Sequence, residues 1–311
     1  MQVRPLSGAT LSKVTPERNA STTMFDHILV AIDFSDASVE SLRWIVKSFP
    51  DAKLTLFHAM PEAEASADLR HSLSGKVDPQ ERELDAHSNI ELLAHSISPD
   101  AEIVVRSGSP IEELRKAAAT SGAQLVVLGA HQKRISPWDH FDSMAEATCD
   151  AVDLPILIWR PTARTGEMTV LAPLDLREGS EPVGEMAGEL ASHLEGRLVI
   201  LHVLPKTFQG FLRAASSPYQ AEETLRKAES SAREEALAQI PARYQEGLEI
   251  QTIVARGQPA RQILATVESE SVDLVVMGKT HLKKRTERAL MGHITGKALR
   301  SAPSSVLTVP I

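Results

Sequence analysis

The chain of 311 residues contains one cysteine, few aromatic residues and no long apolar run. Cys149 alone cannot form an internal disulfide, and a single cysteine excludes a zinc site built from several thiolates. Aromatic residues make up 4% of the chain, so its cores are expected to be aliphatic. No run approaches the roughly 20 apolar residues that a membrane-spanning helix needs, so no membrane span is expected.

Basic residues are fewer than acidic ones. The 41 Asp and Glu residues outnumber the 33 Lys and Arg residues, which gives a formal net charge of −8. Without a basic surface for phosphates or aromatic stacking platforms, nucleic acid is not expected as a partner. The remaining composition, with 42% hydrophobic and 24% charged residues, is typical of a soluble globular protein. The length corresponds to about two domains.

Residues 1–23 differ in composition from the rest of the chain. Seven of them are Ser or Thr, three are basic and one is acidic, and they contain no apolar segment of the kind found in secretory signals. We interpret this segment as a disordered tail, with a transit peptide as the alternative. A cytoplasmic location is expected accordingly.

The rest of the chain is an internal repeat. Strand-like runs recur in the same order in both halves, for example LVVLGAH at 125–131 and LVVMGKTH at 274–281. Near-constant separations of 142, 144, 149 and 149 residues relate four pairs of landmarks, which are Asp33 and Asp175, His58 and His202, Gly108 and Gly257, and Gly129 and Gly278. The sequence therefore predicts two copies of one domain, at 24–161 and 167–311, joined by the polar segment PTARTGE.

Each half alternates short β-branched runs with segments of helical periodicity. Val183, Ala187, Leu190 and Leu194 recur at three- and four-residue steps and form one apolar helix face. Ser109 is placed to cap a helix that begins at Pro110. Continuous apolar strands that alternate with helices indicate a parallel sheet covered on both faces. The predicted fold is α/β, with two tandem doubly wound, Rossmann-like domains.

Several motifs resemble those of the universal stress proteins. These motifs are ILVAIDFS, GSPIEEL, DLVVMG, and ALMG followed by ALRSAPSSVLTV. The similarity covers roughly residues 25–311, and the motif pattern of the family occurs in the right order in each half. The resemblance implies the adenine-nucleotide α-hydrolase-like form of the fold. It also implies a ligand site at the carboxyl ends of the strands, beside helix N-termini that can hold phosphate.

Nucleotide-binding members of that family carry Gly-x2-Gly-x9-Gly-Ser/Thr after the fourth strand. In the second half Gly278 and Gly292 match, whereas Leu282 stands near the middle glycine and His293 replaces the hydroxyl residue. Basic residues follow Gly278, and they are interpreted either as neutralising phosphate or as a solvated helix face. These are Lys279, Lys283, Lys284, Arg285 and Arg288.

The resemblance assigns residues of the second half to a bound adenine nucleotide, either ATP or AMP, with or without Mg²⁺. Pro173, Asp175 and Val203 are expected at the adenine and ribose end. The phosphate side is expected to be lined by Met277, Gly278, Gly292, His293 and Thr295. A helix-capping role is the alternative for Asp175.

The first half departs further from the pattern. Asp142 and Ser143 stand where Gly-Ser is expected, and a carboxylate there repels phosphate and caps the helix itself. The stretch with GAHQ, Trp138 and SMAEA resembles family members that do not bind ATP. No nucleotide is therefore expected in the first half.

No catalytic constellation or metal-ligand spacing stands out among the eleven histidines. His58 and His202 end equivalent strands and are expected to make structural hydrogen bonds. Cys149 is expected within the helix AEATCDAV beside Asp150, a setting that does not lower the pKa of a thiol.

The last apolar strand of each half, at 154–160 and 304–311, is an exposed edge unless it is paired. The two edges are expected to pair with each other in an intramolecular pseudo-dimer, or between chains in a homodimer.

Three functions remain open at this point. The first is a stress-response regulator that binds nucleotide in its second half and acts on a partner protein. The second is an interaction or scaffold module of the same fold without nucleotide. The third is an ATP-hydrolysing enzyme, for which the sequence offers no catalytic base, so the chain is not expected to be an enzyme.

Overall fold

The computed structural model describes residues 23–60, 79–130, 141–161, 166–177, 179–205, 217–279 and 293–311. The predicted disordered tail, apart from Thr23, lies outside these residues.

The described strands form one ten-stranded sheet with the order β3-β2-β1-β4-β5-β10-β9-β6-β7-β8. Neighbouring strands are parallel except at the centre, where β5 and β10 are antiparallel. The first half supplies β1 (His27–Ala31), β2 (Lys53–Met60), β3 (Glu102–Ser107), β4 (Leu125–Gly129) and β5 (Ile156–Trp159). The second half supplies β6 (Thr169–Pro173), β7 (Arg197–Pro205), β8 (Ile250–Gly257), β9 (Leu274–Lys279) and β10 (Ser305–Pro310).

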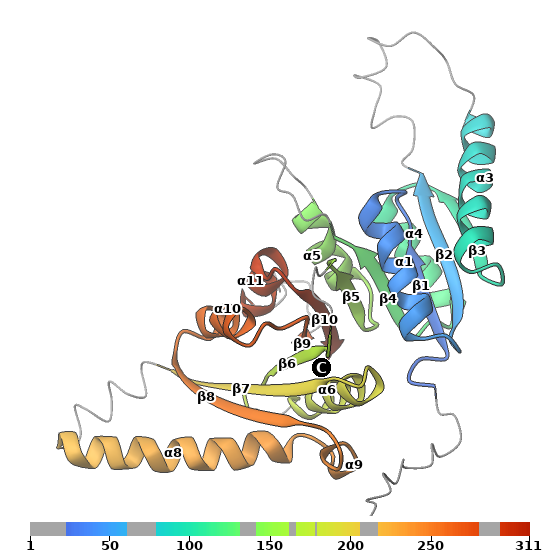
Figure 1. The fold of residues 1–311 in the computed structure, drawn as a ribbon. Coiled ribbons are helices and arrows are strands. Elements are labelled where there is room, and N and C mark those ends of the chain that lie inside the picture. The colour runs from blue at the N-terminus through green and yellow to red at the C-terminus, as the bar shows by residue number, and fades with distance from the viewer. Residues whose placement is uncertain are drawn as a thin grey trace, which may run out of the picture.

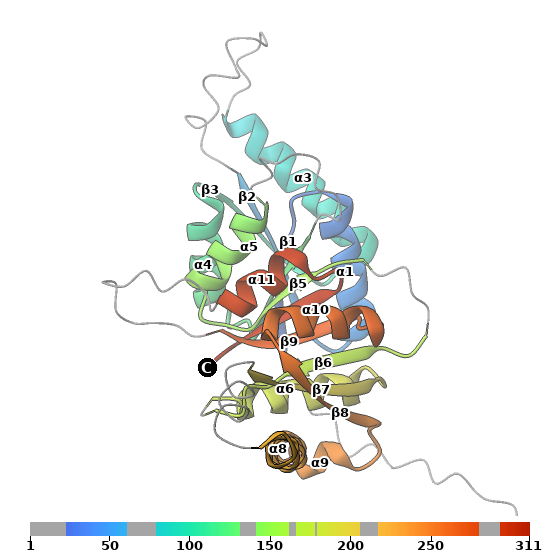
Figure 2. The same cartoon turned by 90° about the vertical axis from the view of Figure 1, so that its left-hand side faces the viewer.

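Helices cover both faces of the sheet. Those of the first half are α1 (Asp36–Ser48), α3 (Pro79–Ile97), α4 (Pro110–Ser121) and α5 (Phe141–Ala151). Those of the second half are α6 (Glu181–His193), α8 (Pro218–Ala238), α9 (Ala242–Gln245), α10 (Pro259–Ser269) and α11 (His293–Ser301). The two halves lie side by side, with α3 and α8 on opposite outer flanks and α5 next to α11 at the centre (Figures 1 and 2).

The alternation of each strand divides the core into two layers. In β1, Ile28 and Val30 pack with α1 and α3, whereas Leu29 faces the layer that contains α4 and α5. The predicted apolar face of α6 is also present, since Val183, Ala187 and Leu190 are buried. The predicted α/β fold with doubly wound parallel strands is confirmed.

The predicted cap of α4 is only partly correct, whereas α1 has a serine cap that was not predicted. Ser35 occupies the N-cap of α1, and its hydroxyl accepts a hydrogen bond from the Ser38 N–H. Ser109 does stand at the N-cap of α4 ahead of Pro110, but its side chain makes no capping bond. Its main-chain carbonyl accepts the Glu113 N–H at 2.9 Å, so Ser109 starts the helix through its backbone alone.

The two apolar edge strands pair with each other within the chain, which was one of the two predicted arrangements. Leu307 lies opposite Leu157, and the pairing extends one residue to either side. This junction is reinforced by Arg160, which follows β5 and donates to the carbonyls of Leu299 and Ser304 in the second half. Because each edge is paired within the chain, neither is left open along these residues.

A second contact joins the halves at the far end of α1. His193, in the last turn of α6, lies 2.7 Å from the Ser48 carbonyl through Nε2, and its ring stacks on Phe49. In the described part of the chain, no helix is long and apolar enough to cross a membrane.

Candidate functional site

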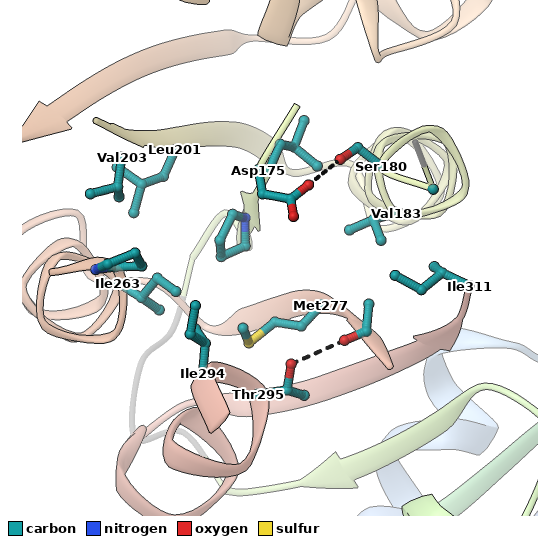
Figure 3. Close-up of a pocket in the computed structure, with 15 residues that line it drawn as sticks. Asp175, Ser180, Val183, Leu201, Val203, Ile263, Met277, Ile294, Thr295 and Ile311 are labelled. Atoms are coloured by element: carbon teal, nitrogen blue, oxygen red, sulfur yellow. Dashed lines mark hydrogen bonds between the residues drawn. The ribbon is translucent and has the colours of Figure 1, made fainter. Parts of the chain in front are cut away.

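A cavity of about 370 Å³ opens at the carboxyl ends of β6, β7 and β9 (Figure 3). It lies between the strands and the first turns of α6, α10 and α11, where the topology of a parallel sheet places ligand sites. Fifteen of the described residues line it, namely Pro173, Leu174, Asp175, Gly179, Ser180, Val183, Leu201, Val203, Pro259, Ile263, Met277, Gly278, Ile294, Thr295 and Ile311.

Asp175 is held in a tight turn at the end of β6. Its Oδ1 accepts the Ser180 hydroxyl at 2.8 Å and the Arg177 N–H at 3.1 Å. Leu176, which lies between Asp175 and Arg177 in the chain, adopts a φ of 58°. This left-handed conformation costs a non-glycine residue about 1 kcal/mol or more. Both hydrogen bonds described for the Asp175 carboxylate are made by Oδ1, and the residue is exposed where it lines the cavity.

The alternative role of Asp175 as a helix cap is wrong. Ser180 occupies the N-cap position of α6, and its side chain makes no capping bond there. The reason is visible in Figure 3, because the Ser180 hydroxyl is directed toward Asp175 instead. The aspartate therefore shapes the loop ahead of the helix.

The opposite wall is formed where β9 meets α11. The Thr295 hydroxyl donates to the Gly278 carbonyl at 3.0 Å and ties the first turn of the helix to the strand. Met277 lies beside them and is buried. Ile294, which precedes Thr295, is 38% exposed and presents an aliphatic side chain to the cavity.

Most of the residues predicted from the sequence meet at this cavity. Six of the eight line it, namely Pro173, Asp175, Val203, Met277, Gly278 and Thr295. Gly292 and the side chain of His293 lie outside the described residues, although the backbone of His293 begins α11. Leu282 and the basic residues at 283–288 also lie outside them.

Sequence reasoning missed several aliphatic residues of the lining. Val183 was recognised as a buried helix residue, but nothing in its periodicity indicated a cavity. Ile263 and Ile294 come from the first turns of α10 and α11, and Ile311 follows β10. Their one sequence signal is their position at element ends that the topology brings to the same edge of the sheet.

Both interpretations of Lys279 are wrong, since it neither faces phosphate nor solvent. Its side chain is 2% exposed, and Nζ donates to the carbonyls of Val152 at 2.7 Å and Cys149 at 3.2 Å. Lys279 therefore caps the C-terminal end of α5, which belongs to the other half. Burial is the main cause that lowers the pKa of its ammonium to about 8.

The equivalent edge of the first half is built differently. Asp33 again accepts from a serine at the N-cap of the following helix, but Ser35 is only two positions away, compared with five positions between Asp175 and Ser180. With this shorter loop, α1 approaches β4 closely. A methyl group placed on Gly129 would lie 2.5 Å from backbone atoms of Ala37.

The paired position in the second half has more room. The atoms nearest to a methyl group on Gly278 would be side-chain atoms, 2.8 Å away at Cδ1 of Ile311 and 3.4 Å away at Val183. The three additional loop residues thus hold the backbone of α6 away from β9. Asp142, Ser143 and Trp138, on which the prediction for the first half depends, have side chains outside the described residues.

The structural roles expected for the paired histidines are confirmed. Nδ1 of His58 lies 2.7 Å from the Ile32 carbonyl, and Nδ1 of His202 lies 2.8 Å from the Leu174 carbonyl. A carbonyl only accepts, so each Nδ1 carries the proton. Among the described residues no cluster of His, Cys, Asp and Glu is suited to a metal ion. Burial raises the pKa of the Cys149 thiol, in agreement with an unreactive side chain.

Comparisons with known proteins agree with this architecture. The sequence model of the Universal stress protein family matches residues 24–158 and 168–310. The Universal stress protein MJ0531 of Methanocaldococcus jannaschii is 35% identical over 77 residues, which are 24% of this chain and 45% of that protein. The chain thus matches less than half the length of this curated relative.

Solved structures are similar over nearly the whole chain. A universal stress protein from Archaeoglobus fulgidus has a TM-score of 0.61 at 18% identity, covering 92% of this chain and 98% of that one. The functionally unknown protein PA1789 from Pseudomonas aeruginosa PAO1 has a TM-score of 0.61 at 16% identity, covering 93% of each chain. At such identities the likeness concerns the fold. Because the family model matches both halves in turn, this chain belongs to the Universal stress protein family and carries two of its domains in tandem.

Proposed function

We propose that this chain is a stress-response regulatory protein of the cytoplasm that binds an adenine nucleotide, ATP or AMP, in its second half. The observation that carries the proposal is the convergence of Pro173, Asp175, Val203, Met277, Gly278 and Thr295 on one cavity. Its volume of about 370 Å³ lies within the range of about 300–1,000 Å³ typical of small-molecule sites.

The lining has the character of a nucleoside site. Aliphatic side chains such as Leu201, Val203 and Ile263 offer a dry surface for a planar base. The Asp175 carboxylate offers an acceptor for a hydroxyl or amino group of the ligand. A base packed against the aliphatic wall, with its sugar at Asp175, uses both features.

Binding without turnover is the role that this lining supports best. Asp175 is the one ionisable residue among the fifteen that line the cavity in the described part of the chain. General acid–base chemistry needs a proton donor and a proton acceptor in reach of the reacting atoms. We therefore propose that occupancy of the cavity regulates interactions with a partner protein.

The second candidate is an interaction module that binds no nucleotide. The side chain of Ile311 favours it, since it already covers Gly278 at the edge of the cavity. The substitutions at Leu282 and His293 point in the same direction.

Two measurements distinguish these candidates. Freshly purified protein is denatured and the supernatant is analysed for released ATP or AMP, and emptied protein is then titrated with each at millimolar concentration, with and without Mg²⁺. We expect binding by the wild type, and we expect Val203→Phe to abolish it by filling the cavity.

The matched control is Ala59→Phe, at the equivalent strand end of the first half, which should bind as the wild type does. If neither nucleotide is released or bound, the proposal is wrong and the interaction module is favoured. Equal loss in both variants would contradict the placement of the site.

A further inference from the structure

Helix α3, on the outer flank of the first half, exposes two leucines (Figures 1 and 2). Its inner side, which includes the buried Ile90, packs against β2 and β3. Leu84 is 66% exposed and Leu92 is 71% exposed. Steps of four residues lead from Leu84 through the exposed Ser88 to Leu92, so the three side chains form one ridge on the side that faces away from the sheet. This α3 ridge carries no charge.

The equivalent helix of the second half shows that the fold does not require such a ridge. Helix α8 connects β7 with β8 as α3 connects β2 with β3, and its inner side includes the buried Ala221 and Leu225. Two positions after each of these, on the outer side, stand Glu223 and Lys227. They form an exposed ion pair at 2.9 Å, which is a typical solvated helix surface. The apolar ridge is therefore a particular feature of α3.

The side chains beside the α3 ridge alternate between acids and imidazoles. At steps of four residues they are Glu83, His87, Glu91 and His95, and His87 already lies 3.2 Å from Glu91 through Nδ1. In an antiparallel pair of identical helices whose two-fold axis passes close to Ser88, Glu83 would face His95 of the second copy. His87 would face Glu91 in the same way. A parallel pair would instead place each acid opposite the same acid.

Each of these acid–imidazole pairs can form a hydrogen bond between two copies. A carboxylate accepts, and an imidazole carries at least one N–H in either charge state. The same two-fold axis brings Leu84 of one copy beside Leu92 of the other, and the small side chain of Ser88 lets the helices approach at the centre. The outer side of α3 is thus complementary to itself in both its apolar and its polar residues.

We infer that α3 is an interaction surface that joins two copies of this chain, with the two helices antiparallel and centred on Ser88. Because β5 and β10 pair within the chain, this dimer uses a different surface from the terminal strands. The acids Glu83 and Glu91 disfavour an anionic membrane as the occupant, since such a surface attracts Lys and Arg. Two leucines from each chain make a small contact, so we expect a weak dimer with a dissociation constant of roughly 1 μM to 1 mM.

The first test is sedimentation equilibrium of the full-length chain at concentrations that span these values. Leu92→Glu should raise the dissociation constant at least about tenfold, because the two-fold axis repeats the lost apolar contact in both copies. The matched control is Tyr219→Glu on α8, where Tyr219 is 79% exposed, and this variant should dimerise as the wild type does. Both positions are exposed, so circular dichroism should show that both variants stay folded.

The second test examines the geometry by cross-linking. Both variants carry Cys149→Ser, which removes the one natural cysteine. Ser88→Cys should form a disulfide-linked dimer under mild oxidation, because the two-fold axis places the two thiols next to each other. Ser230→Cys, at an exposed serine of α8, should stay monomeric.

The outcomes that overturn the α3 dimer are distinct. They are a wild type that stays monomeric at every concentration, and a Leu92→Glu variant that dimerises like the wild type. Dimerisation that is lost in Tyr219→Glu would place the interface on α8 instead. Equal cross-linking through Ser88→Cys and Ser230→Cys would contradict the antiparallel arrangement around Ser88.

Discussion

The buried ammonium of Lys279 makes the junction between the halves sensitive to alkaline pH. The folded chain releases this proton near pH 8, whereas the unfolded chain holds it up to its ordinary pKa of 10.5. Between these values the unfolded state binds more protons, so the contribution of Lys279 to stability rises with pH. Below pH 8 both states are protonated, and the cost of the buried charge, about 3 kcal/mol, is present in full.

Replacement by methionine separates two opposing effects. Lys279→Met removes that cost but leaves the carbonyls of Cys149 and Val152 without their donor, at about 1–3 kcal/mol each. At pH 7 the two effects on the free energy of unfolding have opposite signs and the same order of magnitude. Between pH 7 and pH 9.5 the wild type should then gain about 2 kcal/mol over the variant, because only the wild type loses the buried proton.

Urea unfolding followed by circular dichroism at both pH values measures this difference. Both proteins carry Cys149→Ser, so that ionisation of the thiol does not contribute. Lys116→Met is the control, since Lys116 is an exposed lysine paired with Glu113 on α4, and its pH profile should follow that of the wild type. A difference between wild type and Lys279→Met that stays constant from pH 7 to pH 9.5 would refute the buried charge.

Two further comparisons test the paired geometry of the halves. Gly129→Ala should lower the free energy of unfolding by about 1–3 kcal/mol, because the new methyl group would lie 2.5 Å from the backbone of Ala37. Gly278→Ala should lower it clearly less, because the methyl group there meets side chains that can move. Urea unfolding measures both values. Equal costs would contradict the difference in loop length. Ser35→Ala should lower the free energy of unfolding by about 1 kcal/mol because it removes the cap of α1, whereas Ser109→Ala should change it little. A larger loss for Ser109→Ala would contradict the finding that the Ser109 side chain makes no capping bond.

The repeat allowed much of the fold to be predicted. Apolar runs in the same order in both halves indicated a doubly wound parallel sheet, and the paired histidines behave alike because each lies near the end of an equivalent strand. The pairing of β5 with β10 also followed from the sequence, since two apolar edges in one chain can cover each other. These features depend on local pattern and on topology.

Features that depend on three-dimensional distances were not predictable. The offset grows from 142 between Asp33 and Asp175 to 144 between His58 and His202, so the sequence shows that residues are added between these landmarks. It does not show that the loop after Asp175 is longer, or how this changes the distance between the helix and Gly129 or Gly278. Lys279 was grouped with its basic neighbours, although strand alternation turns it into the core between the halves. Ile311 reaches the cavity only because β10 runs beside β9.

The central claim is that an adenine ligand occupies the cavity of the second half, and methyl spectra of the isotope-labelled chain test it most directly. Titration with AMP should shift the methyl signals of Ile263, Ile294 and Ile311 together, because all three line the cavity. The signal of Ile111, on α4 of the first half, should stay in place. Spectra that do not change at millimolar AMP, or that change in the first half instead, would contradict the account.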